Sequence, residues 1–554
     1  MPRLLRVGWS VVSCLAVACK DDGGSADEGT SAADTSSGGT TMMTTTTVGT
    51  SSESSGVADT SSGSSSTGEV DLPDPLPPLD SVVLTTDARR VQSHAIEPEP
   101  VSDPRVPAEL DQLIADGYGE EMEAPGEAII DVTIDGMPAP ADGANAARVT
   151  RFVHLADTQL ADDESPTRLV SFDNNQAFAG AFRPQDGHEC NIVNAAVRTI
   201  NAVHADDPLD FVVLGGDNAD SAQTNEVEWY VDILDGAPVV ECDSGIDDDP
   251  VPGPGNDNKD PFAPVGLDVP WYWVMGNHDV LVQGNFAIDA QESKAIGDNA
   301  DAGTRDWSMP GGPIVMGTVP ADDRRALLDG PSLLEIVAGS GDGHGVTDDV
   351  IAYGKAFYTF DIGDTDIRFI IIDTAAQTGG AEGVIRQADV DAFIQPALDQ
   401  AVTDGKFVLL ASHHASGSLG DGSGLGGMQQ PDALTTEEWQ SLLGEYDNVI
   451  AHLCGHSHVH RVTPIEPMGG HPYWEIITSA IADHPHQMRI FEIRDEDNGY
   501  YSLSSIALDV ALPDDDPIAN DGHVRGITDN TSGWQPTGEG IPEDRNVRLF
   551  FQLP

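Results

Sequence analysis

Five short apolar runs in this chain each end in a cluster of Asp, Asn, Gln or His residues. Their β-branched and aromatic composition is typical of buried strands. The runs cover residues 148–155, 210–214, 271–275, 407–411 and 449–453. The carboxyl ends of strands in an α/β sheet lie along one edge, where ligands bind. We therefore expect polar residues that are far apart in the sequence to meet in one crevice.

The spacing of the runs predicts the fold class. Two further apolar runs, at 357–362 and 367–372, also read as strands. Helices are predicted between several of these strands, at 191–204, 225–234, 387–401 and 435–443. Alternating strands and helices indicate an α/β domain with a substantially parallel core. From residue 473 the predicted strands (473–478, 488–493 and 500–508) come closer together, which favours an antiparallel portion. We place the domain at 148–508, after a lead-in at 80–147 and before a C-terminal extension at 509–554.

Two inserts interrupt this pattern. Residues 242–268 are acidic and rich in Pro and Gly, and residues 282–350 look long and irregular. We expect both to be surface excursions.

The N-terminus predicts export. Arg3 and Arg6 precede a short apolar run at 7–17, which is too short to span a bilayer. Ala16-Val17-Ala18-Cys19 is similar to a bacterial lipobox, in which Cys19 would carry the lipid; ordinary cleavage after Ala18 is the alternative. Residues 20–79 are Ser, Thr, Gly and Asp with few apolar residues, which predicts a disordered tether. We expect an exported lipoprotein, periplasmic or on the cell surface, that meets the membrane only through this anchor.

The charge excludes some partners. Lys and Arg number 26 against 93 Asp and Glu, a formal net charge of −67. So acidic a surface repels nucleic acid, and it would repel anionic substrates unless bound cations reverse the field locally. Five cysteines do not make a disulfide scaffold; Cys190 and Cys242 are a candidate pair in an oxidising compartment.

The polar clusters carry the chemistry. They read Asp157-Thr158-Gln159, Gly216-Asp217 with Asp220, Gly276-Asn277-His278-Asp279, His413-His414, and Gly455-His456-Ser457-His458. Asp, Asn and His are hard or borderline donors that suit Mn, Zn, Fe or Mg.

In this order, the clusters resemble the calcineurin-like metallophosphoesterase superfamily. The resemblance implies a four-layer α/β/β/α sandwich of two mixed β-sheets with flanking helices, and hydrolysis of a small phosphorylated substrate, a phosphomonoester or phosphodiester. It implies two divalent or trivalent metal ions, which lower the pKa of a shared water to give hydroxide. The implied metal ligands are Asp157, Gln159, Asp217, Asn277, His413, His456 and His458. The implied catalytic residues are His278, over the substrate, and Asp220, which orients it.

A bacterial exported branch of that superfamily is also similar, through Asp-x-Gln followed by Ser165-Pro166-Thr167-Arg168 and through residues 480–489 and 543–547. On this basis Arg168 is a candidate phosphate contact, with a surface ion pair as the alternative. His414 is a candidate substrate contact, with a hydrogen-bonded structural imidazole as the alternative.

Gln159 departs from the more common pattern, which has His. An amide oxygen is a neutral and poorer donor, so the first metal position would bind weakly, prefer a harder metal, or stay empty without substrate. The alternative function is therefore a surface binding lipoprotein that retains a degenerate domain. A Ser-His-Asp hydrolase is disfavoured, because no Gly-x-Ser-x-Gly elbow follows a strand.

Overall fold

The computed structural model describes residues 73–79, 84–94, 96, 102–141, 143–174, 180–245, 250–341, 344–512 and 515–552. The predicted signal segment, Cys19 and almost all of the predicted tether lie outside these residues. Residues 72–554 form one compact unit. Among the described residues, no helix combines the length and apolarity needed to cross a membrane.

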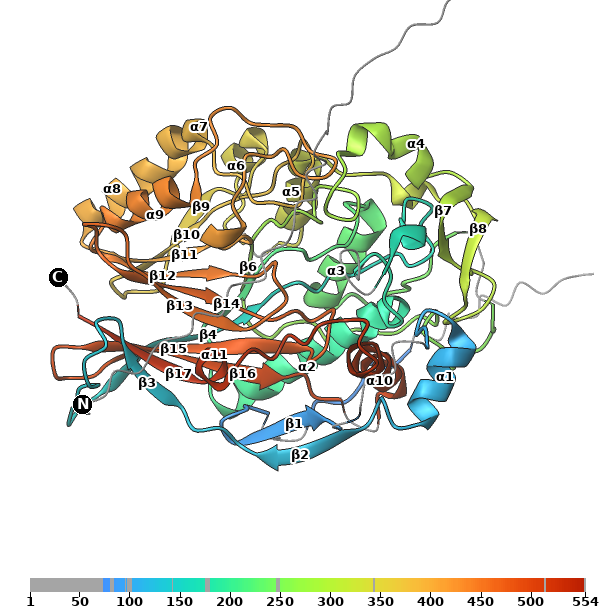
Figure 1. Cartoon of the computed structure of the whole chain (residues 1–554), viewed down its shortest axis with the longest axis horizontal. Helices are drawn as coiled ribbons and strands as arrows, with labels where there is room; N and C mark the ends of the chain where they lie inside the picture. The colour runs from blue at the N-terminus through green and yellow to red at the C-terminus, as the bar shows by residue number, and fades with distance from the viewer. Residues whose placement is uncertain are drawn as a thin grey trace, which may run out of the picture. The chain divides into compact units, whose positions relative to one another are not determined.

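Two mixed sheets form the centre of this unit (Figure 1). The first has seven strands in the order β3-β17-β16-β15-β4-β5-β6, and the second has six in the order β13-β14-β12-β11-β10-β9. In the first, the bounds are β3 Ile130–Thr133, β4 Ala147–Leu155, β5 Phe211–Leu214, β6 Trp271–Trp273, β15 Gln487–Asp495, β16 Tyr501–Asp509 and β17 Val547–Phe551. In the second, they are β9 Tyr358–Asp361, β10 Ile367–Ile371, β11 Phe407–Ala411, β12 Val449–Cys454, β13 Arg461–Ile465 and β14 Tyr473–Ile477.

The sheets pack face to face through aromatic side chains. The ring of Phe152 on β4 lies 4.9 Å from that of Phe211 on β5 and 5.4 Å from that of Phe369 on β10. Neighbouring side chains point the other way: Ile370 and Val408 pack with Leu398 and Trp439 of the outer helices. Strands that are buried on both faces need continuous apolar runs, which is why the sequence identified them.

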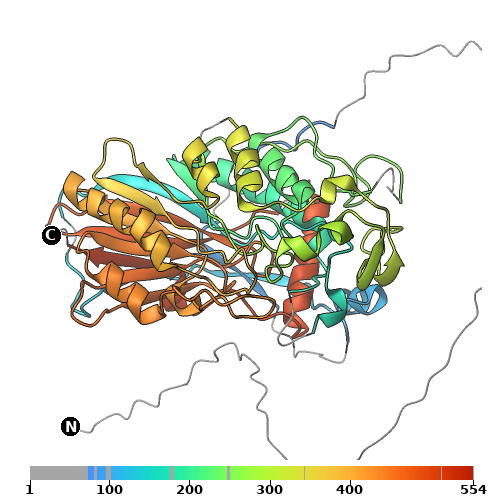
Figure 2. The ribbon, with the colours of Figure 1, turned by 90° about the horizontal axis from the view of Figure 1, so that it is seen from above.

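Helices complete the layers. The helices α8 (Gln395–Asp404) and α9 (Thr436–Gly444) cover the outer face of the six-stranded sheet, seen from above in Figure 2. The helix α2 (Glu189–Asp206) runs along the other side of the seven-stranded sheet, with α3 (Thr224–Asp235) packed against it (Figure 1). The predicted four-layer sandwich is confirmed.

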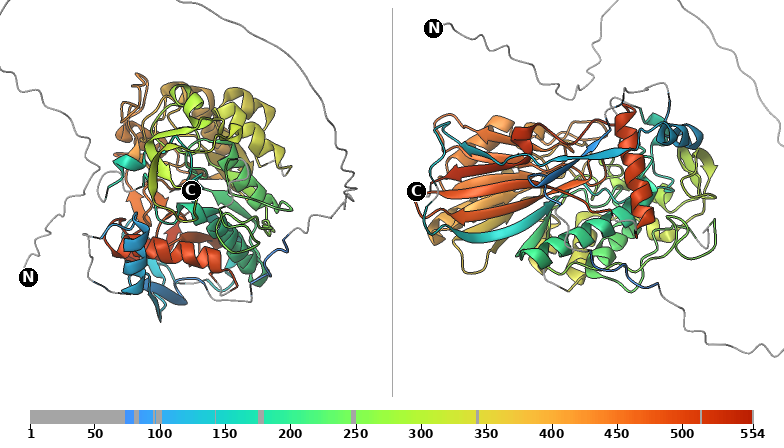
Figure 3. Two further views of the ribbon diagram at one scale, coloured as in Figure 1. Left: turned by 90° about the vertical axis from the view of Figure 1, so that its right-hand side faces the viewer. Right: turned by 90° about the horizontal axis from the view of Figure 1, so that it is seen from below.

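The lead-in and the extension join the same unit. The strand β17 of the extension pairs with β16 and, in parallel, with β3 of the lead-in. The helix α1 (Pro107–Ala115) contacts α10 (Pro517–Thr531), which also packs on α2; Figure 3 shows α10 crossing the end of the sheet. The strands β1 (Arg89–Ser93) and β2 (Glu121–Pro125), which α1 separates in the sequence, form a two-stranded antiparallel sheet that lies below the larger sheet in Figure 1. Residues 148 and 508 are therefore not edges of a compact unit.

Two details of the predicted fold need correction. The strand β14 runs parallel to β12. Among the strands after residue 473, the antiparallel pairings are those of β14 with β13, of β15 with β4 and β16, and of β16 with β17. The second insert is also more regular than expected: it contains a hairpin, β7 (Asn299–Arg305) with β8 (Ile314–Thr318), and the helices α4 (Glu292–Ala295), α5 (Gly330–Gly339) and α6 (Asp348–Tyr353).

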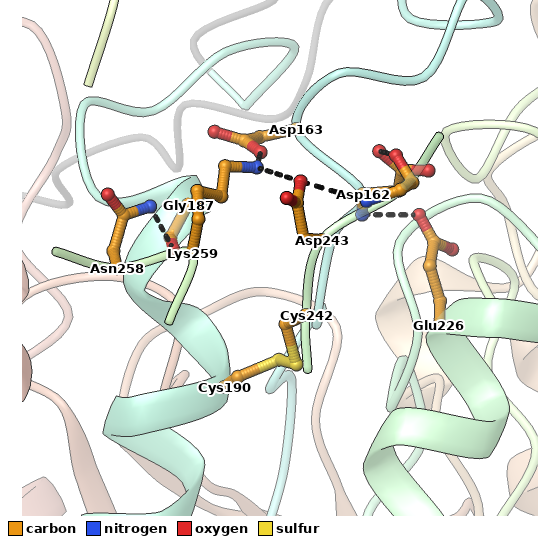
Figure 4. Close-up of a disulfide and its surroundings, with 10 residues drawn as sticks. Asp162, Asp163, Gly187, Cys190, Glu226, Cys242, Asp243, Asn258 and Lys259 are labelled. Carbon is orange, nitrogen blue, oxygen red and sulfur yellow. Dashed lines mark hydrogen bonds and ion pairs between the residues drawn. A yellow bond between two sulfur atoms is a disulfide. The ribbon is translucent and has the colours of Figure 1, made fainter. Parts of the chain in front are cut away.

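A disulfide between Cys190 and Cys242 ties the first insert to the start of α2, as Figure 4 shows, and confirms the predicted pair. Beside it, Lys259 of this insert is buried and lies 2.9 Å from Asp163 and 2.7 Å from Glu164. The insert thus supplies a buried cation to the loop that follows Gln159. It is anchored covalently and electrostatically, although it was expected to be a surface excursion.

Candidate metal centre and active site

All five polar clusters lie at the carboxyl ends of their strands, as predicted. Asp157 and Gln159 follow β4, Asp217 follows β5, and Asn277 follows β6. The residues His413 and His456 follow β11 and β12 of the other sheet. The crevice between the two sheets therefore receives ligands from both.

The backbone is strained at several of the residues that follow the strands. Asp157, Gln159, Asp217, His456 and His458 all have positive φ angles, between 40° and 68°. Such conformations cost about 1–3 kcal/mol each and cluster at functional sites. The adjacent glycines provide the space: a Cβ on Gly276 would lie 2.1 Å from Asp217 Oδ1, and one on Gly455 would lie 2.5 Å from Asp157 Oδ2.

Asp217 is the central residue of the site. Its Oδ2 lies 2.9 Å from His413 Nε2, and its Oδ1 accepts a hydrogen bond of 2.8 Å from the backbone N–H of His278. Asp157 Oδ1 lies 3.4 Å from His458 Nε2 and 3.8 Å from His413 Nε2. Asp157, Asp217 and His413 each direct one ligand atom into a space less than 4.8 Å across, as do His413, His414 and His456.

The electrostatics of this space favour cations. Burial lowers the pKa of His413, but Asp217 and Asp157 raise it to about 9. Burial likewise lowers the pKa of His458, and Asp157 and Asp483 raise it to about 10. The carboxylates thus hold protons on these imidazoles, and divalent cations would satisfy the same attraction while releasing those protons.

Two buried atoms that can ligate a metal, Asn277 Oδ1 and His413 Nε2, support this interpretation. Asn277 Oδ1 has no hydrogen-bond partner among the described residues, although Asn277 Nδ2 donates to the carbonyl of Gly284 at 3.0 Å. His413 Nε2 lies close to Asp217 but makes no well-formed hydrogen bond, while its Nδ1 is held by the carbonyl of Gly215 at 3.0 Å. A buried polar atom without a partner is costly, so these donors fit a bound metal.

His278 and Asp220 lie together, as predicted. His278 Nδ1 is 2.7 Å from the carbonyl oxygen of Asp220 and 3.2 Å from its Oδ1. Burial lowers the pKa of His278, but Asp217 and Asp220 raise it above the ordinary value. This ring is held by one nitrogen, and its side chain is 15% exposed.

The two residues expected to contact substrate have protein partners instead. Arg168 is fully buried, with Nη2 2.5 Å from Asp186 and Nη1 3.3 Å from Asp220. His414 lies 2.8 Å from Thr374 Oγ1 through Nδ1 and 3.1 Å from the carbonyl of Ala381 through Nε2. Arg168 therefore orients Asp220 in a buried ion pair, not the surface pair considered above, and His414 matches the structural alternative.

Sequence reasoning missed three residues of the site. Asp279 accepts hydrogen bonds from the backbone N–H groups of Gly276, Asp217, Asn218 and Ala219 at 2.7–3.1 Å, so it ties the second cluster to the third. Asp483 Oδ2 holds His458 Nδ1 at 2.5 Å, and Arg183 Nη2 donates to Gln159 Oε1 at 2.6 Å. Asp279 lies in the cluster after the third run, and Asp483 lies within residues 480–489, so both belong to segments that resemble known phosphoesterases. No sequence pattern marks Arg183.

Comparison with known proteins agrees with this geometry. The family model described as calcineurin-like phosphoesterase matches residues 150–460, more than half of the chain. No curated protein sequence matches.

Among solved structures, a dimetal phosphatase from Danio rerio is similar, at 14% identity and a TM-score of 0.36, over 66% of this chain and 100% of that one. A purple acid phosphatase from yellow lupin (Lupinus luteus) seeds has 14% identity and a TM-score of 0.27, over 70% and 54%. GAP50, the anchor in the inner membrane complex of Plasmodium, has 12% identity and a TM-score of 0.25, over 71% and 97%. These scores are too low to transfer any property to this chain.

The family match rests on the segment that contains every residue of the candidate metal centre. That segment runs from β4 to the last histidine after β12, so it spans both sheets and all five clusters. The chain belongs to the calcineurin-like phosphoesterase family.

Proposed function

We propose that this protein is a metal-dependent hydrolase of phosphoric esters, with a binuclear centre held at the edges of its two sheets. The observation that carries the proposal is the convergence of Asp157, Asp217 and His413 around one small space. Asn277 Oδ1, in the same centre, has no hydrogen-bond partner in the part of the chain that the structure describes. The residues that would hold the ions are Asp157, Asp217 and His458 at the first position and Asp217, Asn277, His413 and His456 at the second. Gln159 is the further candidate ligand at the first position.

Bound ions would supply positive charge for the phosphoryl oxygens and acidify an attacking water. They would also offset the repulsion between the acidic chain and an anionic substrate. The Asp, Asn and His donors suit Mn, Zn, Fe or Mg.

The chain's own contribution to the chemistry is to hold a proton. His278 Nδ1 faces both oxygens of Asp220 named above, so Nε2 is the nitrogen left to face the ester. Asp217 and Asp220 raise the pKa of the ring, which favours its protonated form. It can therefore donate to the leaving oxygen, a role worth about 10²–10⁴ in rate. Arg168 is a positioning residue because it holds Asp220.

Export as a lipoprotein through Cys19 remains part of the proposal, as does a small phosphorylated substrate in place of nucleic acid. The Cys190–Cys242 disulfide supports an oxidising compartment. Labelling with a radioactive fatty acid tests the anchor: the native chain should incorporate label and a Cys19→Ala chain should not.

The test of function is hydrolysis of p-nitrophenyl phosphate and bis-p-nitrophenyl phosphate with each of Mn, Zn, Fe and Mg. We expect turnover with at least one metal, and the better substrate separates monoesterase from diesterase. No turnover on either ester with any of these metals would reject the proposal.

A second candidate is a metal-binding surface lipoprotein without turnover. It is favoured by one observation, the bond that Arg183 makes to Gln159. Metal content of two per chain, with turnover abolished in Asp217→Ala, would exclude it.

A further inference from the structure

The amide of Gln159 is turned away from the role that the family pattern gives it. Its Oε1 accepts a hydrogen bond of 2.6 Å from Arg183 Nη2, and its Nε2 lies 3.4 Å from Asp217 Oδ2. A guanidinium can only donate, so the amide atom that faces it must be the oxygen. The NH₂ group then faces the central carboxylate, and nitrogen of an amide does not ligate metal ions.

Arg183 is itself fixed in this position. Its Nε donates to Asp483 Oδ1 at 2.6 Å, and its own backbone N–H donates to Asp186 at 2.9 Å. It is 3% exposed, and the charge of the neighbouring carboxylates raises its pKa despite burial, so the charge is permanent. A permanent cation therefore lies one hydrogen bond from the expected ligand atom.

The same arginine supports the other side of the first position. Asp483, which it pairs with, also holds His458 Nδ1 at 2.5 Å and leaves Nε2 to face Asp157. A carboxylate behind a histidine is the usual support of a metal ligand. The first position thus keeps Asp157, Asp217 and a well-oriented His458, and lacks only the amide.

We propose that Arg183 withholds Gln159 from the first metal position, so that this chain binds one metal ion tightly at the second position and a further ion weakly at the first. An amide oxygen that already serves a guanidinium is a poorer donor to a cation, and the guanidinium repels that cation. The inference concerns metal affinity, and it stands whether or not the phosphoesterase activity proposed above is found.

The test is a titration of the metal-free protein with Mn²⁺, followed by calorimetry and by electron paramagnetic resonance. We expect two steps separated by at least about 100-fold in Kd, since outer-shell changes alone shift metal affinity by about 10–100-fold. One equivalent should give the signal of an isolated ion, and a spin-coupled pair should appear only at excess. Two ions of equal affinity, or a coupled pair at one equivalent, would overturn the inference.

Two variants identify the cause. In Arg183→Met, the Kd of the weaker of the two binding steps (the weak step) should fall by about 10–100-fold. Arg198→Met is the matched control, because Arg198 is also buried and paired with two carboxylates, Asp515 and Asp516, away from the site; it should leave both steps unchanged. An unchanged weak step in Arg183→Met, or an equal change in the control, contradicts the role of Arg183.

If Arg183→Met does not fold, the same Mn²⁺ titration of Gln159→Glu tests the inference. A carboxylate has one oxygen for Arg183 and another for the metal, so the weak step should tighten by the same about 10–100-fold while the arginine stays in place. A weak step that does not tighten overturns the inference. Esterase assays are not needed: an inactive chain with two unequal steps rejects the proposed function alone, and an active chain with equal steps rejects this inference alone.

Discussion

The two metal positions differ in how their donors are held, although both are built from the same kind of strand end. At the second position, Asn277 Oδ1 has no hydrogen-bond partner among the described residues, and the Gly215 carbonyl holds His413 through Nδ1 and leaves Nε2 beside Asp217, so both donors are available to a metal. At the first, Gln159 Oε1 is already bonded to Arg183. Strand ends bring ligands together, and the loops behind them decide which ligands are available.

Asp217 is the residue common to both positions, so its loss should have the largest effect. We expect Asp217→Asn to reduce bound metal to below one ion per chain and activity by at least about 10³-fold, because metal charge contributes several kcal/mol to such reactions. Metal analysis of the purified protein and ester hydrolysis measure this. Asp361→Asn, at a partly exposed ion pair with Arg368 far from the clusters, is the control. Full activity in Asp217→Asn would show that Asp217 is not the shared metal ligand.

His278 separates proton donation from metal binding at both positions. His278→Gln should lower kcat by about 10²–10⁴-fold, because it removes the general acid. Both metal-binding steps should keep their affinities, since no metal ligand changes. A loss of metal in this variant would show that His278 is a ligand, which contradicts the role proposed here.

Asn277 and Gln159 provide the direct comparison of the two positions. Asn277→Ala should weaken the tight step by more than the about 10–100-fold typical of an outer-shell change, since a ligand itself is lost. Gln159→Ala should change the weak step by less than about tenfold, because its oxygen is already engaged. Calorimetry with Mn²⁺ measures both, and equal effects would mean that the positions do not differ as described.

Asp483 should affect the first position alone. Asp483→Asn removes the charge behind His458 and should weaken the weak step by about 10–100-fold. The tight step and the circular dichroism spectrum should not change. A change in the tight step would show that the positions are coupled through more than Asp217.

Much of the central fold was predictable from sequence because strands buried on both faces must be apolar throughout. The runs that became β4, β5, β10, β11 and β12 were found within a residue or two of their observed ends. The strand β17 was missed because it follows a polar segment and gains its place only by pairing with β3 and β16.

The site was predictable where a residue belongs to a cluster after a strand. It was not predictable where a loop supplies the partner: Arg183 lies between a segment outside the described residues and α2, with no periodicity to mark it. The partners of His414 and Arg168 were not predictable for the same reason. Their types suggested substrate contacts, but Thr374, Ala381, Asp186 and Asp220 satisfy them, and such pairings depend on the tertiary structure.

Turnover of both nitrophenyl esters, measured against the number of Mn²⁺ ions bound per chain, tests most directly whether this protein is a binuclear phosphoesterase with unequal metal positions. We expect little hydrolysis at one ion and a steep rise as the first, weaker position fills. Two bound ions without hydrolysis of either ester would contradict this expectation, provided that the Asp217→Asn variant has lost both ions.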